Sequence, residues 1–132
     1  IFGGPGTSRF KMVSQSGEIV DYQGNTVINS SGSYTGTKKR QAITTNYTTS
    51  IDDVFISITD TTSPRGIAIS TTMIKEGREI IIKDEDGTAN INNITIKGEG
   101  GETFDGSATI VINTSYGHKK LYCDGVNWAD IT

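Results

Sequence analysis

The side chains with the clearest binding chemistry lie near the end of the sequence. Tyr116, His118 and Lys119 stand together in one predicted exposed turn that contains Gly117, and Asn127 precedes the only tryptophan, Trp128. Aromatic faces cover the apolar side of a sugar ring while amides and charged groups bond its hydroxyls, and exposed turns commonly carry function. We therefore predict that Tyr116, His118, Lys119 and Asn127 bind a ligand. Core packing and a ligand contact are the alternatives for the tryptophan.

The acidic run Asp84-Glu85-Asp86-Gly87, flanked by Lys83 and Asn90, is the cluster that most resembles a cation site. Oxygen ligands in a tight loop with glycine are what Ca²⁺ binding requires. The alternating acids and the later glutamate of the EF-hand pattern are absent, however. The alternative is a β-turn in which acidic side chains bond their own backbone. We predict this turn and no metal site.

Catalytic candidates are few. His118 and Cys123 are the only possible nucleophile–base pair, and neither stands in a known signature, so we expect Cys123 to be a buried apolar residue. Two carboxylates could cleave a glycoside, but nothing selects a pair among the fifteen acidic residues. The candidates considered were Asp52, Asp53, Glu99, Glu102 and Asp105. We predict no enzyme activity and no cofactor.

Composition predicts the elements that must position these residues. The 132 residues include nineteen Ile, six Val and nineteen Thr but only one Leu. β-branched residues suit strands, whereas soluble helices favour Leu, Ala, Glu and Lys, so we expect an all-β chain. The net charge of −3, without a dense basic stripe, argues against nucleic acid as a partner. The longest apolar runs have three residues, as in Ile80–Ile82, and are too short to insert into a membrane.

The pattern of strands divides the chain near residue 40. Residues 1–40 are polar, and strand-like segments alternate there with Gly17, Gly24 and Gly32. We expect a short β-structured stalk that other chains stabilise, and a flexible linker is the alternative. In residues 41–132, short strands recur about every dozen residues, which predicts a sandwich or barrel of antiparallel pairs. Ile81 would point away from the core of such a head and need a neighbouring subunit as cover, which predicts a parallel homotrimer.

The order of several short motifs in residues 47–130 resembles a distal head module of trimeric fibre and spike proteins from bacteriophages and large DNA viruses. The motifs are Tyr47, Asp52–Ile56, Gly77–Asp84, Gly87–Ala89, Asn92–Ile96, Phe104–Gly106 and Leu121–Trp128. The resemblance implies a C-terminal, jelly-roll-like antiparallel β-sandwich behind a glycine-punctuated shaft. It also implies a location on the virion surface.

Three functions are expected from the resemblance and the residues. The first is non-catalytic attachment to a host surface receptor, a glycan or a protein. The second is a structural role in which the head caps and aligns the trimer. The third, a polysaccharide depolymerase, is the most distant, because the chain is short for the long β-helix that provides the sugar groove of such enzymes.

Overall fold

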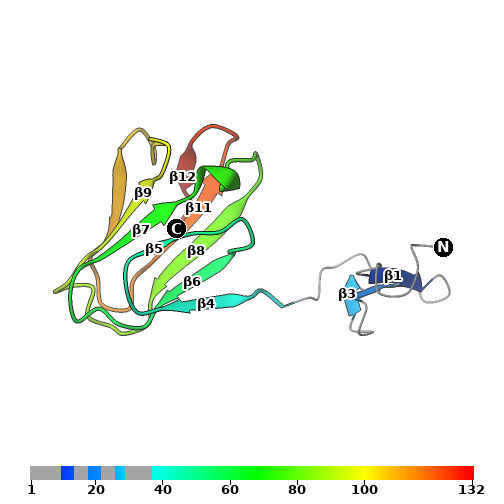
Figure 1. Cartoon of the computed structure of the whole chain (residues 1–132), viewed down its shortest axis with the longest axis horizontal. Coiled ribbons are helices and arrows are strands. Elements are labelled where there is room, and N and C mark those ends of the chain that lie inside the picture. Colours follow the sequence, from blue (N-terminus) through cyan, green and yellow to red (C-terminus); the bar gives the residue numbers. More distant parts are fainter. Residues whose placement is uncertain (1–9, 14–17, 22–25, 29–36) are drawn as a thin grey trace. The chain divides into compact units, whose positions relative to one another are not determined.

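The computed structural model describes residues 10–13, 18–21, 26–28 and 37–132, and the chain divides into two units, Ile1–Lys38 and Lys39–Thr132 (Figure 1). In the first unit, β1 (Phe10–Val13), β2 (Glu18–Asp21) and β3 (Thr26–Ile28) form an antiparallel sheet in that order. These strands coincide with the strand-like segments of the predicted stalk. The glycines predicted to separate them lie outside the described residues.

The second unit, which we call the head, is built from strands and one short 3₁₀ helix. Its elements are β4 (Arg40–Ile43), β5 (Tyr47–Thr48), β6 (Phe55–Ile58), β7 (Arg65–Ile69), η1 (Thr71–Met73), β8 (Glu79–Asp84), β9 (Ile94–Gly98), β10 (Thr109–Ile112), β11 (His118–Cys123) and β12 (Trp128–Asp130). One sheet has the order β12-β11-β8-β6-β4 and the other the order β10-β9-β7-β5. The prediction of an all-β chain is confirmed.

The prediction of antiparallel pairing is wrong for half of the head. From β4 to β9 the chain alternates between the two sheets, so that each return adds a parallel neighbour: β4–β6, β6–β8, β5–β7 and β7–β9. The antiparallel strand pairs of the head are β9–β10, β8–β11 and β11–β12. Parallel neighbours need a long crossover, and here the opposite sheet supplies it. A jelly roll is antiparallel, so this order departs from that expectation.

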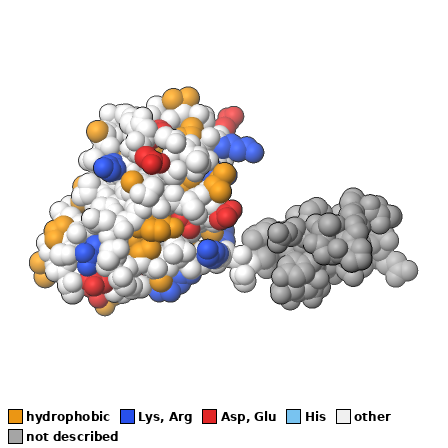
Figure 2. Space-filling model, in the orientation of Figure 1, with side chains coloured by type: hydrophobic (Ala, Val, Ile, Leu, Met, Phe, Trp, Pro, Cys, Tyr) orange, Lys and Arg blue, Asp and Glu red, His pale blue; other side chains and the backbone are white. Residues whose placement is uncertain are grey.

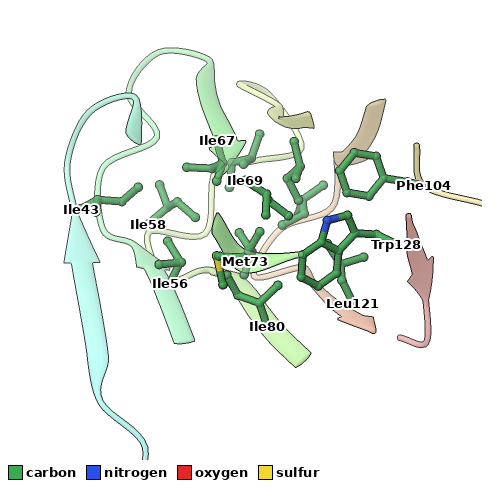
Figure 3. Packing of buried hydrophobic residues seen from close by; sticks show 14 of the residues in the cluster. Ile43, Ile56, Ile58, Ile67, Ile69, Met73, Ile80, Phe104, Leu121 and Trp128 are labelled. Carbon is green, nitrogen blue, oxygen red and sulfur yellow. The ribbon is translucent and has the colours of Figure 1, made fainter. Parts of the chain in front are cut away.

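Isoleucine fills the core of the head. Side chains from both sheets form one buried cluster, in which Ile56, Ile58, Ile80 and Ile82 have no exposed surface (Figure 3). Full burial of such a side chain contributes about 2 kcal/mol to folding. Ile81 points to the opposite face of β8 and is only half-buried, as its place between two core residues predicts.

The direction of the strands gives the head two ends. The strands β4, β6 and β8 run from the proximal end, where the chain enters at Arg40, to the opposite or distal end. Loops 59–64, 84–93 and 113–117 lie at the distal end, whereas turn 124–127 lies at the proximal end. On the face shown in Figure 2, acidic and basic side chains of the head are scattered rather than gathered by sign. Among the described residues, no helix is long and apolar enough to cross a membrane.

Candidate functional site

Asp84 joins two distal loops through one buried carboxylate. Its side chain is completely buried. Oδ1 accepts the backbone N–H groups of Asp86 (3.1 Å) and Gly87 (2.9 Å), and Oδ2 accepts those of Ala89 (3.0 Å) and Tyr116 (3.1 Å). Four donors compensate the loss of water around the charge. The carboxylate therefore fixes the backbone of Tyr116 against the loop that follows β8.

The Tyr116 ring lies over Gly87 and still faces solvent. A Cβ atom on Gly87 would lie 2.4 Å from the ring, so glycine is required for this close approach. The residue Tyr116 is 60% exposed, an unusual fraction for a large aromatic side chain held in a fixed position. The Lys83 ammonium donates to the Tyr116 carbonyl oxygen and lies 5.8 Å from the ring centroid. The Tyr116 ring is therefore exposed to solvent, while its contacts with Gly87 and Lys83 restrict its position.

His118 and Lys119 lie in β11 rather than in the predicted turn. His118 stands opposite Lys83 in the antiparallel register of β11 and β8, and it is exposed. Directly opposite residues of paired strands share a face of the sheet, so His118 and Lys83 stand side by side. Lys119 points to the other face, where it makes an ion pair with Asp130 at 2.8 Å. We call Lys83, Tyr116 and His118 the distal cluster.

Asn127 is at the other end of β11 from the distal cluster. The six residues of β11 span roughly 20 Å, so Asn127 and Tyr116 are separated by about that length. The Asn127 carboxamide oxygen accepts the Thr103 backbone N–H at 2.8 Å, and thereby ties the turn after β11 to the loop before Phe104. Of the four predicted ligand-binding residues, the structure brings together Tyr116 and His118.

Two further residues at the distal end did not stand out in the sequence as ligand contacts. Lys83 was noted only as a neighbour of the acidic run, because its proximity to Tyr116 depends on the pairing of β8 with β11. Ile91 is 75% exposed in the polar loop between β8 and β9. An isoleucine between two Asn residues, in a segment without alternation, is a sequence signal that could have indicated it.

The acidic run forms the predicted turn. Asp86 accepts hydrogen bonds from the Thr61 backbone N–H (3.0 Å), the Thr61 hydroxyl (2.9 Å) and the Thr88 hydroxyl (3.1 Å). These bonds, from Thr61 first, lower the pKa of the Asp86 carboxyl below its usual value. Within residues 37–132 and the described strands before them, no three His, Cys, Asp or Glu side chains are grouped to hold a metal ion.

Of the catalytic candidates, the His118–Cys123 pair is separated and Asp53 is engaged in hydrogen bonds. His118 and Cys123 lie five residues apart on one strand and therefore on opposite faces, and Cys123 is completely buried. Asp53 is buried, and its Oδ2 accepts the Tyr47 hydroxyl at 2.8 Å and the Ser50 N–H at 2.7 Å. Trp128 belongs to the core cluster, where it is 2% exposed (Figure 3).

The chain matches no known family model, and a search of the curated proteins found no match either. The function of the head is therefore inferred from the geometry of the distal cluster.

Proposed function

We propose that this chain is the distal part of a trimeric viral fibre or spike, exposed on the virion surface, and that its head attaches to a host surface receptor without catalysis. The observation that carries the proposal is the exposed Tyr116 ring, which lies over Gly87 on a backbone whose N–H the buried Asp84 carboxylate accepts. Preorganised aromatic side chains are favoured contact residues, because little conformational freedom is lost when they bind.

A glycan is the receptor that this chemistry fits best. The Tyr116 ring offers a face for the apolar side of a sugar, and Lys83 and His118 offer hydrogen-bond donors next to it. A single shallow contact of this kind is weak. Three copies on one particle would bind together, and their combined avidity would exceed the affinity of any one site.

The outer face of the five-stranded sheet supports the trimer. Phe55 and Ile81 are register partners on this face and are half-buried, with Arg40 and Lys120 on either side of them in the same row. We propose that the two sheets of the head form a β-sandwich and that a neighbouring copy covers this apolar pair.

Ile81→Asp should then convert the trimer to monomers in sedimentation velocity. The control Thr109→Asp, at an exposed position of the other sheet, should leave the trimer intact. A parent chain that sediments as a monomer would refute the trimer.

Attachment is tested with the full chain on cells that the parent virus infects. Tyr116→Ala should lower binding at least about tenfold, which corresponds to about 1.4 kcal/mol, and leave the melting temperature nearly unchanged. Val126→Ala is the matched control, because Val126 is equally prominent (68% exposed) but lies at the proximal end. Equal binding by the Tyr116→Ala chain would refute the site, and release of reducing ends from host polysaccharide would favour a depolymerase.

The second candidate is a structural head that caps and aligns the trimer while another protein binds the host. The half-buried Phe55 and Ile81 favour it, since they serve association whether or not the distal cluster binds anything. A glycan array and a cell-binding assay on the trimeric chain distinguish the two candidates. Trimer formation without any binding would favour the structural role.

A further inference from the structure

A cavity of about 310 Å³ lies on the four-stranded sheet, away from the distal cluster. Its lining residues come from three neighbouring strands and the residue before β5: Asn46, Tyr47, Thr48, Gly66, Ala68 and Lys97. This volume is at the lower end of the range for small-molecule sites, which suits a ligand of one sugar unit rather than a larger molecule.

The cavity exists because the middle strand carries almost no side chain on its outer face. Ala68 is the register partner of Thr48 on one side and of Lys97 on the other, and Gly66 is the preceding outward residue of β7. Thr48 and Lys97 are two strand spacings apart, or roughly 10 Å. Between them, Gly66 and Ala68 form a floor that is mostly backbone. Side chains of ordinary size at these positions would fill the cavity.

Hydrogen-bond donors that no described residue engages line the cavity. The Asn46 carboxamide oxygen accepts the Gly66 N–H at 2.8 Å, which fixes the side chain and leaves its NH₂ group available. Lys97 is exposed, and among the described residues no carboxylate lies within ion-pair distance of its ammonium group. The Tyr47 side chain, by contrast, is the register partner of the buried Ile67, packs against the core and donates to Asp53 at 2.8 Å, so it offers no donor to the cavity.

We infer that this cavity binds a sugar unit that carries a carboxylate. Lys97 is the only charged side chain among the described residues of the lining, so the site is complementary to an anion. The Asn46 amide and the Thr48 hydroxyl are placed to bond the hydroxyl groups of the same sugar. The inference adds a second site to the head and stands whether or not the distal cluster binds the receptor.

The test is an NMR titration of the full, isotope-labelled chain with glucuronic acid, with glucose as the neutral counterpart. Glucuronic acid should shift the backbone amide signals of Gly66, Ala68 and Lys97 in a saturable manner, and glucose should bind at least about tenfold more weakly. Lys97→Met should weaken glucuronic acid binding by a similar factor. Lys75→Met, at another exposed lysine that forms no ion pair with a described residue, should have no effect.

A filling variant tests the cavity independently of charge. Ala68→Leu keeps an apolar residue in β7 and places a side chain in the space between Thr48 and Lys97, so the amide shifts should disappear while the melting curve is retained. Equal responses to glucose and glucuronic acid, or equal losses in Lys97→Met and Lys75→Met, would overturn the inference. Shifts that depend on protein concentration without sugar would also overturn it, because a second copy would then occupy the cavity. Tyr116→Ala should leave the glucuronic acid response unchanged, which separates this site from the proposed attachment site.

Discussion

The two ends of the head are each organised by an aspartate, but over very different distances in the chain. At the distal end, the buried Asp84 binds backbone groups as far away as Tyr116, thirty-two residues later. At the proximal end, the exposed Asp124 accepts only the N–H groups of Val126 (2.8 Å) and Asn127 (2.7 Å), which belong to its own turn. The bonds of Asp124 are local, although Asn127 ties the same turn to Thr103, whereas the bonds of Asp84 themselves join distant parts of the chain.

This difference bears on function, because only the distal end combines an exposed aromatic ring with long-range support. The Tyr116 ring is held through Asp84, Gly87 and Lys83, which all come from β8 or the loop after it. Val126, the exposed apolar residue of the proximal turn, donates its N–H to Asp124, two residues earlier in the same turn. A contact surface that must keep its shape before binding is better built in the first way.

The largest expected effect comes from replacing the two aspartates by asparagine. At Asp84 both carboxylate oxygens accept two N–H groups, so either orientation of an asparagine points its NH₂ group at two buried donors. We expect Asp84→Asn to reduce the free energy of unfolding by about 3 kcal/mol. At Asp124 both bonds go to Oδ1, and an asparagine keeps them by turning its NH₂ group to solvent. Asp124→Asn should therefore be nearly neutral.

Urea unfolding followed by circular dichroism measures both changes, and amide hydrogen exchange in residues 84–89 and 113–117 locates the first. Equal stability losses for the two variants would contradict the contrast between a local and a long-range aspartate. So would an Asp84→Asn chain that is as stable as the parent.

A smaller effect is expected from replacing a glycine in the turn that follows each aspartate. Gly87 and Gly125 both have positive φ angles, of 90° and 99°, so alanine at either position costs about 1–2 kcal/mol. A Cβ at Gly125 would meet its nearest neighbour, Glu76, at 3.6 Å, which is ordinary contact, whereas at Gly87 it would collide with the Tyr116 ring. Gly87→Ala should therefore also displace the ring and lower attachment, and Gly125→Ala should not.

Thermal unfolding and the cell-binding assay, applied to both glycine variants, check this prediction. If Gly87→Ala binds host cells as well as Gly125→Ala does, then the seat of the ring on Gly87 is irrelevant to attachment.

Much of the secondary structure, but not its pairing, could be predicted from the sequence. Alternation located β6 and β7, where Ile56 and Ile58, and then Ile67 and Ile69, are buried at every second position. A short apolar run located β8. Alternation missed β5, which has only two residues and no period to detect. It also could not show that the chain alternates between two sheets, since strand spacing is the same whether consecutive strands pair or lie in opposite layers. The antiparallel prediction failed for that reason.

The candidate site was predictable to the extent that it is local. The turn around Tyr116 follows from its own residues, and so does the acidic turn near Asp84. The contact between these two turns does not follow from their own residues. It requires β8 and β11 to be neighbours, and these strands are separated by thirty-three residues. Asn127 was grouped with Tyr116 on sequence proximity, yet the intervening strand carries it to the opposite end.

The smallest expected effect is a response to acid that begins at the distal end. Hydrogen bonds from the Thr62 side chain and backbone, and then from Arg65, lower the pKa of Asp60 to about 2, and the pKa of Asp86 is also lowered by Thr61 and Thr88. Both carboxyls thus bind protons less readily in the folded chain than in the unfolded one, where their pKa is about 3.9. Their contribution to stability is complete above pH 5 and is lost as the pH falls from about 4 towards 2.

Asp124, at the proximal end, has a lowered pKa too, but it stabilises only its own turn. Protection factors, which correct amide exchange for its intrinsic slowing in acid, should therefore fall on acidification more in loops 59–64 and 84–93 than in turn 124–127. Asp60→Asn should reduce the acid-induced change in the distal loops. Carboxyl ¹³C shifts give the individual titrations, and an Asp60 midpoint at or above about 3.9 would contradict this account.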